Sequence, residues 1–277
     1  MPQIRKHKTF IQITQHLHYG KLLLKRAVLA PLGYSPPVIT EFIQYLEEAE
    51  NKHITDLNLL LTTEPPVQQG AELIKITLKN KYPHIHIHTT TLPFNDIQSQ
   101  KDSLEFMKIC AKTLKELREI HKTNEIYLCV AGGRKDMCII LTLLGQLFQI
   151  NGVYHIIMTD IKTFNIHLER MRKHIEELAK TQNKQEYYQK HKKEFDELMF
   201  PHPSTYTVIQ IPTLPYPQNT LNQIKKLLTK IKTPKNKTNL PTETLTKLQT
   251  SGIIRITKNY IYTTQLGQDL GKILQHI

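Results

Sequence analysis

Between residues 26 and 159, short apolar runs alternate with helical patterns, and no other feature of the chain constrains its fold as strongly. The segments between the runs place apolar residues three to four positions apart, which is typical of amphipathic helices. Strands that alternate with helices predict an α/β, Rossmann-like fold: a mostly parallel sheet with helices on both faces. The expected strands lie at residues 27–30, 57–61, 85–88, 126–130 and 153–158.

The region before this pattern is difficult to interpret. Residues 1–24 are polar and rich in histidine, with one strand-like run at residues 9–13. We treat them as an N-terminal extension of a main domain that spans residues 25–215. Within that domain, a charged helical insertion is expected at about residues 165–200, and a further strand follows at 206–211.

The end of the chain has the pattern of a second, smaller domain. After a segment that contains several prolines, residues 220–277 read as a helix, a helix, a hairpin and a final helix. This is the order of a winged helix, although its usual middle helix is not evident at residues 232–239.

Charge indicates an anionic partner. The chain has 37 Lys and Arg residues against 24 Asp and Glu, a net charge of +13. Residues 221–277 alone hold ten basic and two acidic residues, a net charge of +8. A nucleotide, a nucleic acid and an acidic protein would each suit this charge, and so would a generally basic surface.

Several classes of protein are disfavoured. No apolar run reaches the roughly 18 residues of a membrane span, and the amino end lacks a signal peptide's apolar core. We therefore expect a cytoplasmic protein without a membrane partner. Cys110, Cys129 and Cys138 lack CxxC spacing, so we expect core residues in a reducing compartment rather than a disulfide frame or a zinc site.

The first candidate site follows the first strand, at Gly33, Tyr34, Ser35 and Pro36. Gly33 allows a tight turn close to a ligand. We expect Ser35 to be the N-cap of the next helix and Pro36 to be its first residue. Such a helix start presents free N–H groups to an anion. An ordinary capped helix is the alternative interpretation.

The second candidate site, Gly132-Gly133-Arg134-Lys135, follows the fourth strand. Its glycines let the backbone approach a ligand closely. The two cations oppose the positive end of the following helix, and a bound phosphate would remove that conflict. The spacing matches neither the Walker loop nor the GxGxxG motif.

Two further turns are expected at the same edge of the sheet, where ligands of such folds bind. Thr62, Thr63 and Glu64 follow the second strand, and Asp96 and Ile97 follow the third. The threonine hydroxyls suit a ribose, a phosphate or a base edge. Simple termination of the strand is an equal alternative.

Histidines form another pattern. His84, His86 and His88 alternate along the third strand, so they should lie on one face of it. Residues two apart on a strand stand about 7 Å apart, which disfavours a shared metal ion. We therefore expect a row that faces solvent or an interface, and no metal. For His155, a core histidine with its hydrogen bond satisfied is favoured over a site residue.

Taken together, the turns resemble the CARF domain of CRISPR-associated proteins. The resemblance rests on the Gly33 turn, the Thr62 turn, the segment with Asp96 and Ile97, the Gly132 turn and residues 154–157. Residues 199–203 are also similar to the stretch that follows the core in related CARF proteins. With the basic winged-helix tail, the chain is similar to the stand-alone ring nucleases of type III CRISPR systems.

The resemblance implies a function. CARF dimers bind cyclic oligoadenylate, usually the tetramer, across their twofold axis. Ring nucleases cut it without a metal or other cofactor, giving linear di-adenylate with a 2′,3′-cyclic phosphate, and so end the immune signal. The family's active-site serine and lysine fall on Ser35 and Lys135. The expected ligand-binding residues are Gly33, Tyr34, Pro36, Thr62, Thr63, Asp96, Ile97, Gly132, Gly133 and Arg134.

The residue types suit this chemistry. A 2′-hydroxyl that attacks its neighbouring phosphate needs in-line positioning and a cation beside the anionic transition state. Lys135 supplies the cation and Ser35 a hydrogen bond, while Arg134 serves a second phosphate or the dimer.

Two alternatives stay open. One is a non-enzymatic, cyclic-oligoadenylate-responsive transcription regulator that binds DNA through its basic tail. The other is a CARF effector whose nuclease is the tail, which however shows neither an RxxxxxH nor a PD-ExK pattern.

Overall fold

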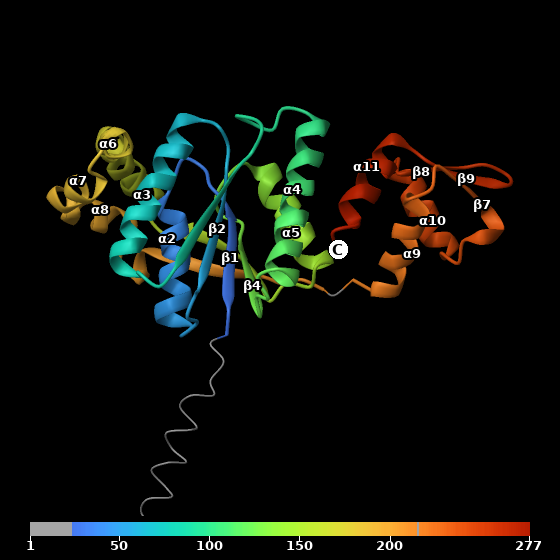
Figure 1. Cartoon of the computed structure of the whole chain (residues 1–277), viewed down its shortest axis with the longest axis horizontal. Coiled ribbons are helices and arrows are strands. Elements are labelled where there is room, and N and C mark those ends of the chain that lie inside the picture. The colour runs from blue at the N-terminus through green and yellow to red at the C-terminus, as the bar shows by residue number, and fades with distance from the viewer. Residues whose placement is uncertain (1–23, 215) are drawn as a thin grey trace, which may run out of the picture.

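The structure is a computed structural model that describes residues 24–214 and 216–277. The predicted N-terminal extension, with its strand-like run at residues 9–13, lies outside the described residues except for Leu24. A large sheet covered by helices on both faces is followed by a C-terminal unit with a small sheet of its own (Figure 1).

The large sheet has six strands in the order β3-β2-β1-β4-β5-β6. Strands β1 to β5 are parallel, and β6 runs antiparallel to β5. Their bounds are β1 Arg26–Pro31, β2 Asp56–Leu61, β3 His86–Thr91, β4 Glu125–Cys129, β5 Gly152–Met158 and β6 Tyr206–Ile211. The predicted Rossmann-like, mostly parallel α/β fold is confirmed. Strands β1 and β4 lie inside the sheet with both faces covered, which explains their continuous apolar runs.

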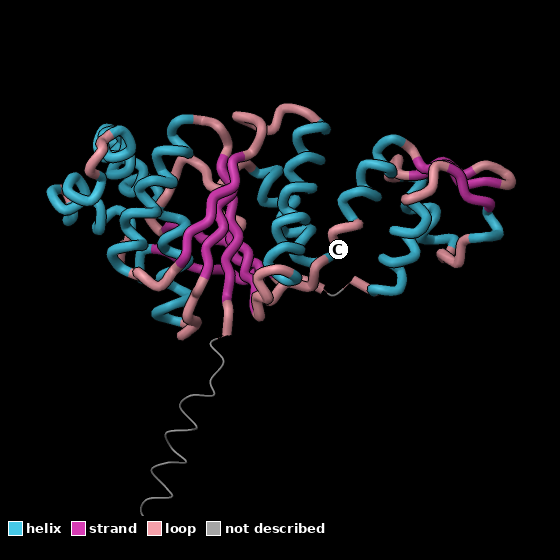
Figure 2. The backbone as a smooth tube through the Cα atoms, viewed as in Figure 1, coloured by secondary structure: helices cyan, strands magenta, loops and turns pink. Residues whose placement is uncertain are grey.

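The helices divide between the two faces (Figure 2). Alternate residues of β1 belong to different cores: Val28 and Ala30 to one, Ala27 and Leu29 to the other. The first core is covered by α2 (Pro37–Gln44), α3 (Pro65–Lys81), α6 (Ile161–Lys180), α7 (Lys184–Lys190) and α8 (Lys192–Met199). The second is covered by α4 (Gln100–Glu119) and α5 (Lys135–Leu147).

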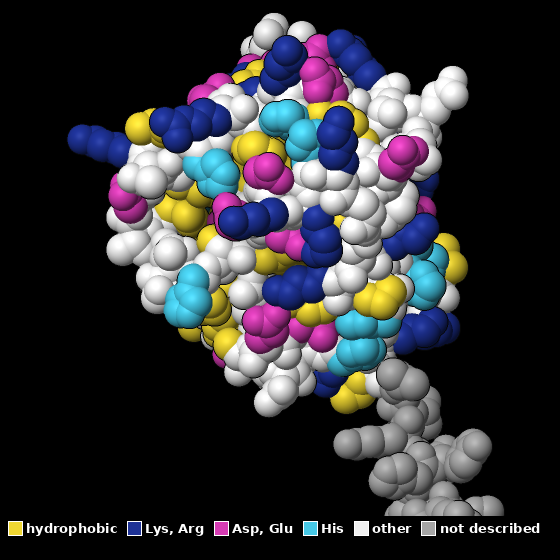
Figure 3. All heavy atoms as spheres, turned by 90° about the vertical axis from the view of Figure 1, so that its left-hand side faces the viewer, with side chains coloured by type: hydrophobic (Ala, Val, Ile, Leu, Met, Phe, Trp, Pro, Cys, Tyr) yellow, Lys and Arg dark blue, Asp and Glu magenta, His cyan; other side chains and the backbone are white. Residues whose placement is uncertain are grey.

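Helices α6 to α8 occupy the region where the sequence predicts a helical insertion. They bury Leu168, Met171, Tyr188 and Phe195 beside α3. Their outer side is polar: Figure 3 shows basic, acidic and histidine side chains mixed over this end of the molecule. No large apolar patch is visible on this face.

The helix expected at residues 38–50 changes type along its length. After α2 the chain forms a π-helix, η1 (Tyr45–Ala49), in which the Glu50 N–H donates to the Tyr45 carbonyl at 3.1 Å. Such segments make up well under 1% of residues and frequently occur at functional sites. The apolar spacing of the sequence cannot distinguish it from an α-helix.

Strand β3 is longer than expected. It continues through Thr89, Thr90 and Thr91, which are exposed at the edge of the sheet and therefore lack the apolar residues that mark a buried strand. His84 precedes the strand, so the expectation of three histidines in one strand row is wrong for this residue.

The C-terminal unit consists of α9 (Gln218–Leu228), β7 (Lys232–Pro234), η3 (Lys235–Lys237), α10 (Thr242–Thr250), β8 (Ile254–Ile256), β9 (Tyr260–Thr263) and α11 (Gln265–Leu274). Strands β8 and β9 form the expected hairpin, and β7 pairs with β9. Residues 232–239 thus hold a strand and a 3-10 turn. Ile273 of α11 joins the second core, and Leu147 at the end of α5 packs against the unit's own core.

Cys110 and Cys129 are fully buried, as expected for core residues, and Cys138 is partly buried. Over residues 24–214 and 216–277, no helix has both the length and the apolar character needed to cross a membrane.

Candidate functional site

The candidate site lies where the strand order reverses. From β1 the chain moves outward to β2 and β3, and then returns past β1 to β4 on its other side. The turns that follow β1 and β4 therefore diverge toward opposite faces, and such a switch point leaves a crevice at the carboxyl edge of the sheet. The predicted turns at Gly33 and Gly132 are these two turns.

The two turns are in direct contact, and glycine is required there. A Cβ atom on Gly132 would lie 2.3 Å from the Pro31 carbonyl oxygen, and one on Gly33 would lie 2.9 Å from the Gly133 nitrogen. Gly133 has a φ of +80°, which L side chains rarely adopt. The glycines thus let two backbone turns approach each other, which brings the N-termini of α2 and α5 to the same place.

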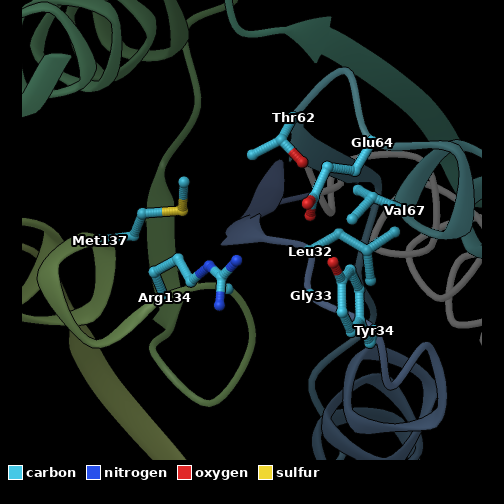
Figure 4. Close-up of a pocket in the computed structure, with 9 residues that line it drawn as sticks. Leu32, Gly33, Tyr34, Thr62, Glu64, Val67, Arg134 and Met137 are labelled. Carbon is cyan, nitrogen blue, oxygen red and sulfur yellow. The ribbon is translucent and has the colours of Figure 1, made fainter. Parts of the chain in front are cut away.

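A pocket opens beside this contact (Figure 4). One wall is apolar, from Leu32, Val67 and Met137. Polar groups come from three different turns, and the full lining is Leu32, Gly33, Tyr34, Thr62, Glu64, Val67, Gly133, Arg134 and Met137. An apolar wall with a few convergent polar groups is typical of a small-molecule site.

Thr62 supplies an unsatisfied group in this pocket. Its residue is 5% exposed, and its hydroxyl has no hydrogen-bond partner within residues 24–214 and 216–277. Burial of a hydroxyl without a hydrogen-bond partner costs free energy. A ligand that formed a hydrogen bond with Thr62 would recover this cost on binding. The backbone around it is fixed, since Gln68 Nε2 donates to the Thr62 carbonyl at 2.6 Å.

Glu64 and Tyr34 form the other polar side of the pocket. The neighbouring Glu64 carboxylate raises the pKa of the Tyr34 hydroxyl above its ordinary value of 10.0, and burial adds a smaller effect in the same direction. The tyrosine therefore remains a proton donor at neutral pH. Together the two side chains offer a donor and an acceptor, which suits a base or a ribose better than a phosphate.

The two cations of the second turn differ in their partners. Arg134 Nε lies 2.9 Å from Asp96 Oδ1, so the arginine is braced against the turn that follows β3. Lys135 is the exposed first residue of α5 and has no ion-pair partner among the described residues. An unneutralised lysine beside the free N–H groups of a helix start is suited to bind an anion.

The predicted role of Ser35 as an N-cap is wrong. Helix α2 begins at Pro37, with Pro36 as its N-cap rather than its first residue, and no side chain caps it. A cap by Ser35 would need the N–H two or three positions further on: Pro37 has none, and the Val38 N–H makes no bond to the Ser35 hydroxyl. In the described part of the chain, the Ser35 hydroxyl has no hydrogen-bond partner and stays available to a ligand.

Several predicted residues lie near the pocket without lining it. Ser35 and Lys135 adjoin the lining residues Tyr34 and Arg134 in sequence, and Asp96 reaches the pocket through Arg134. The Thr63 N–H donates to the Phe94 carbonyl at 3.2 Å, while Ile97 packs against the second core. Pro36 and Gly132 contribute to the turns alone.

The sequence did not identify some of the site residues. Val67 and Met137 fall at the starts of expected helices, Leu32 lies in the first turn, and none of the three is expected from the sequence to bind the ligand. Arg172 gave no signal, because it comes from α6 in the helical insertion. Its Nη1 donates to the Tyr34 carbonyl at 2.7 Å and so holds the first turn in place. His155, by contrast, contacts the Val130 carbonyl at 3.2 Å, in keeping with a satisfied core histidine.

The model of the family described as CRISPR-associated protein NE0113 matches residues 35–247. The chain belongs to this family. The matched region starts in the Ser35 turn, includes the whole of the sheet after β1 and ends within α10.

Other comparisons are more distant. No curated protein matches the sequence at a significant level. Among solved structures, Enterococcus italicus Csm6 bound to cyclic hexa-2′-fluoro-hexa-dAMP is similar, with a TM-score of 0.46 and 17% identity over 74% of this chain. The chain spans 46% of the length of that protein.

Proposed function

We propose that this CRISPR-associated protein is a CARF-domain ring nuclease, which binds cyclic tetra-adenylate and cuts it without metal to linear di-adenylate with a 2′,3′-cyclic phosphate. The observation that carries the proposal is the contact between the turns after β1 and β4. It brings Ser35 and Lys135, whose side chains have no partner among the described residues, to one edge of the sheet, beside a pocket suited to a nucleoside. Membership of a CRISPR-associated family supports a nucleotide signal as the ligand.

The pocket and the turns divide the ligand between them. The apolar wall of Leu32, Val67 and Met137 packs against a base, and Thr62 and Glu64 bond its polar edge or the ribose. The phosphate next to that nucleoside lies outside the pocket, at the starts of α2 and α5. This arrangement separates the carboxylate of Glu64 from the phosphate, which it would otherwise repel.

The chemistry requires few groups. The ribose 2′-hydroxyl attacks the adjacent phosphorus in line, and the 5′-oxygen of the next nucleotide leaves. Lys135 stabilises the negative charge that builds up on the phosphate, and Ser35 donates a hydrogen bond to it. The chain's own contribution is thus orientation and charge, which rigid glycine turns provide.

A homodimer is part of the proposal. Ile139 and Leu143 lie one turn apart on α5 and are 68% and 46% exposed, and Ile157 and Ile209 of β5 and β6 are also exposed. Their strand positions alternate with residues of the first core, so all four apolar side chains are on the side of the sheet that carries α5. A second copy that covered them would bring two Lys135 side chains toward one cyclic ligand.

The test is a cleavage assay with cyclic tetra-adenylate in EDTA, with products resolved by chromatography and mass spectrometry. We expect linear di-adenylate with a cyclic phosphate end. Lys135→Ala should lower the rate by about 100-fold or more, the usual loss when a group that stabilises developing charge is removed. Lys193→Ala, which removes an exposed lysine from the first turn of α8, is the matched control and should leave the rate unchanged.

Two results would contradict the proposal. A ring that binds but stays intact for hours would exclude the enzyme. A Lys135→Ala variant that cuts at the wild-type rate would exclude the proposed role of Lys135 but not the nuclease activity itself.

The alternative function is a transcription regulator that responds to the same ligand, and one surface favours it. At the tip of the C-terminal sheet, Lys235, Lys237 and Lys258 line one depression together with Asn236, Asn259 and Tyr260. Three lysines on a strand tip suit the phosphates of a nucleic acid. Binding of a DNA duplex that weakens steeply with salt, together with an intact ring, would favour this function.

A further inference from the structure

A cluster of metal-ligating side chains lies at the opposite edge of the sheet from the pocket. Glu47 comes from the π-helix η1, His53 from the loop before β2, and His84 from the loop before β3. One oxygen of Glu47 and one ring nitrogen of each histidine all lie within 4.8 Å of one another. The three residues are far apart in sequence, so the fold alone brings them together.

The distances within the cluster are those of a nearly formed site. Glu47 Oε1 lies 3.0 Å from His84 Nε2, and Glu47 Oε2 lies 3.7 Å from His53 Nδ1. Two ligands on a tetrahedral zinc ion, each bonded at about 2.0–2.1 Å, are roughly 3.3 Å apart. The two imidazole rings are stacked, with centroids 4.0 Å apart. Binding of one ion requires both rings to turn out of this stack, so that one nitrogen of each points to the ion.

Each ligand is held by the residue next to it. Leu46 and Ile54 are fully buried, and Ile85 is 7% exposed, so the backbones at Glu47, His53 and His84 are anchored. The Ile54 N–H donates to Glu47 Oε1 at 2.7 Å and orients the carboxylate. Hydrogen bonds of this kind to a ligand carboxylate are usual around metal sites. The π-helix contributes as well, because it sets the direction of the Glu47 side chain at the end of α2.

The charge around the cluster also points to a cation. The neighbouring carboxylates are paired with lysines, Glu48 with Lys81 and Glu50 with Lys52. Glu47, although its side chain is only 12% exposed, has no lysine or arginine partner in the part of the chain that the structure describes. Besides the Ile54 N–H, its partners there are the two histidines. A bound divalent cation would be its counter-ion.

We propose that Glu47, His53 and His84 bind a zinc ion, with the fourth position left to water. Two imidazoles and one carboxylate are a common ligand set for this ion. The site lies apart from the ring-cutting pocket and ties the end of α2 to the starts of β2 and β3. It differs from the shared strand row of His84, His86 and His88, which the sequence disfavours, because only His84 of that row takes part.

The test uses the full chain, stripped with a chelator and titrated with Co²⁺ while visible absorption is followed; Zn²⁺ then displaces the cobalt. We expect the bound Co²⁺ to give the absorption bands of a four-coordinate ion. We also expect variants of the cluster to bind one equivalent of zinc fewer than the wild type. Residues 1–23 also contain His7, His16 and His18, so the difference between variants, rather than the total metal bound, is decisive.

The variants distinguish the site from other histidines. His84→Ala and Glu47→Gln should each weaken zinc binding by more than tenfold, because loss of even an outer hydrogen bond to a ligand costs 10–100-fold. His86→Ala, an exposed histidine on β3 outside the cluster, is the matched control and should bind as the wild type does. Circular dichroism verifies that each variant is folded, and His53→Ala, at a 47% exposed position, replaces any that is not.

Equal zinc affinity in the wild type and in the folded cluster variants would overturn the proposal. The result is independent of the proposed nuclease activity. We expect His84→Ala to cut the ring at the wild-type rate in EDTA, so that loss of the zinc site and loss of cleavage are separate outcomes.

Discussion

Glu41 offers a sharp test of the energetics of this fold. It lies on α2 and is fully buried. Neither of its carboxylate oxygens has a hydrogen-bond partner among the described residues. Burial raises the pKa of its carboxyl from an ordinary value of 4.5 to about 7. We predict that Glu41→Gln stabilises the protein at alkaline pH.

The size and the pH range follow from this difference. As pH rises through 4.5 the unfolded chain loses the Glu41 proton and is stabilised, whereas the folded chain keeps it until about pH 7. The folded state therefore loses stability between these two values and then levels off. Since one pKa unit corresponds to about 1.4 kcal/mol, the loss amounts to about 3 kcal/mol above pH 7. Glutamine does not ionise, so the stability of the variant does not fall in this pH range.

The assay is urea unfolding of both proteins at pH 5, 6, 7 and 8. The free energy of unfolding of Glu41→Gln, minus that of the wild type, should rise by about 2.5 kcal/mol from pH 5 to pH 8, because part of the effect is already present at pH 5. Glu194→Gln, at an exposed position on α8, is the control and should show a flat difference. A flat difference for Glu41→Gln as well would refute the argument that this carboxyl is buried without a partner.

Three further outcomes are expected. Gly133→Ala forces an alanine to a φ of +80° against Pro31 and Met137, so unfolding experiments should show a loss of at least 1 kcal/mol, roughly the cost of a left-handed alanine, and ligand affinity should fall. Leu143→Glu places a charge on the exposed apolar side of α5; light scattering should show a monomer where the wild type is a dimer, and a wild-type monomer would contradict the proposed interface. Arg172→Ala removes the bond to the Tyr34 carbonyl, so calorimetry should show weaker binding of cyclic tetra-adenylate with little change in global stability, and unchanged affinity would exclude a role in positioning.

Much of the fold could be predicted because buried parallel strands are conspicuous. The runs that became β2 and β4 are apolar on both faces, and few other structures require that. Edge strand β3 was underestimated for the opposite reason, since its threonines face solvent. The π-helix could not be predicted, because its apolar spacing over five residues fits an α-helix equally well.

The candidate site could be predicted only where one turn held several unusual residues. Gly132 to Lys135 can be identified because two glycines precede two cations that oppose the positive end of the helix dipole. A serine before a proline is typical of a helix start, but here the helix begins one residue later than this pattern predicts, with Pro36 as its N-cap. Arg172 and the cluster of Glu47, His53 and His84 arise from contacts between distant segments, which neither periodicity nor spacing records.

Helix α5 has one consequence for signalling within the chain. Its first residue is Lys135, at the candidate phosphate site, and its last, Leu147, packs against the core of the C-terminal unit. Thirteen residues of α-helix make a stiff rod of about 20 Å. A ligand that draws the start of this helix toward the sheet would therefore also move its far end. Helix α5 thus connects the candidate ligand site mechanically to the basic C-terminal unit.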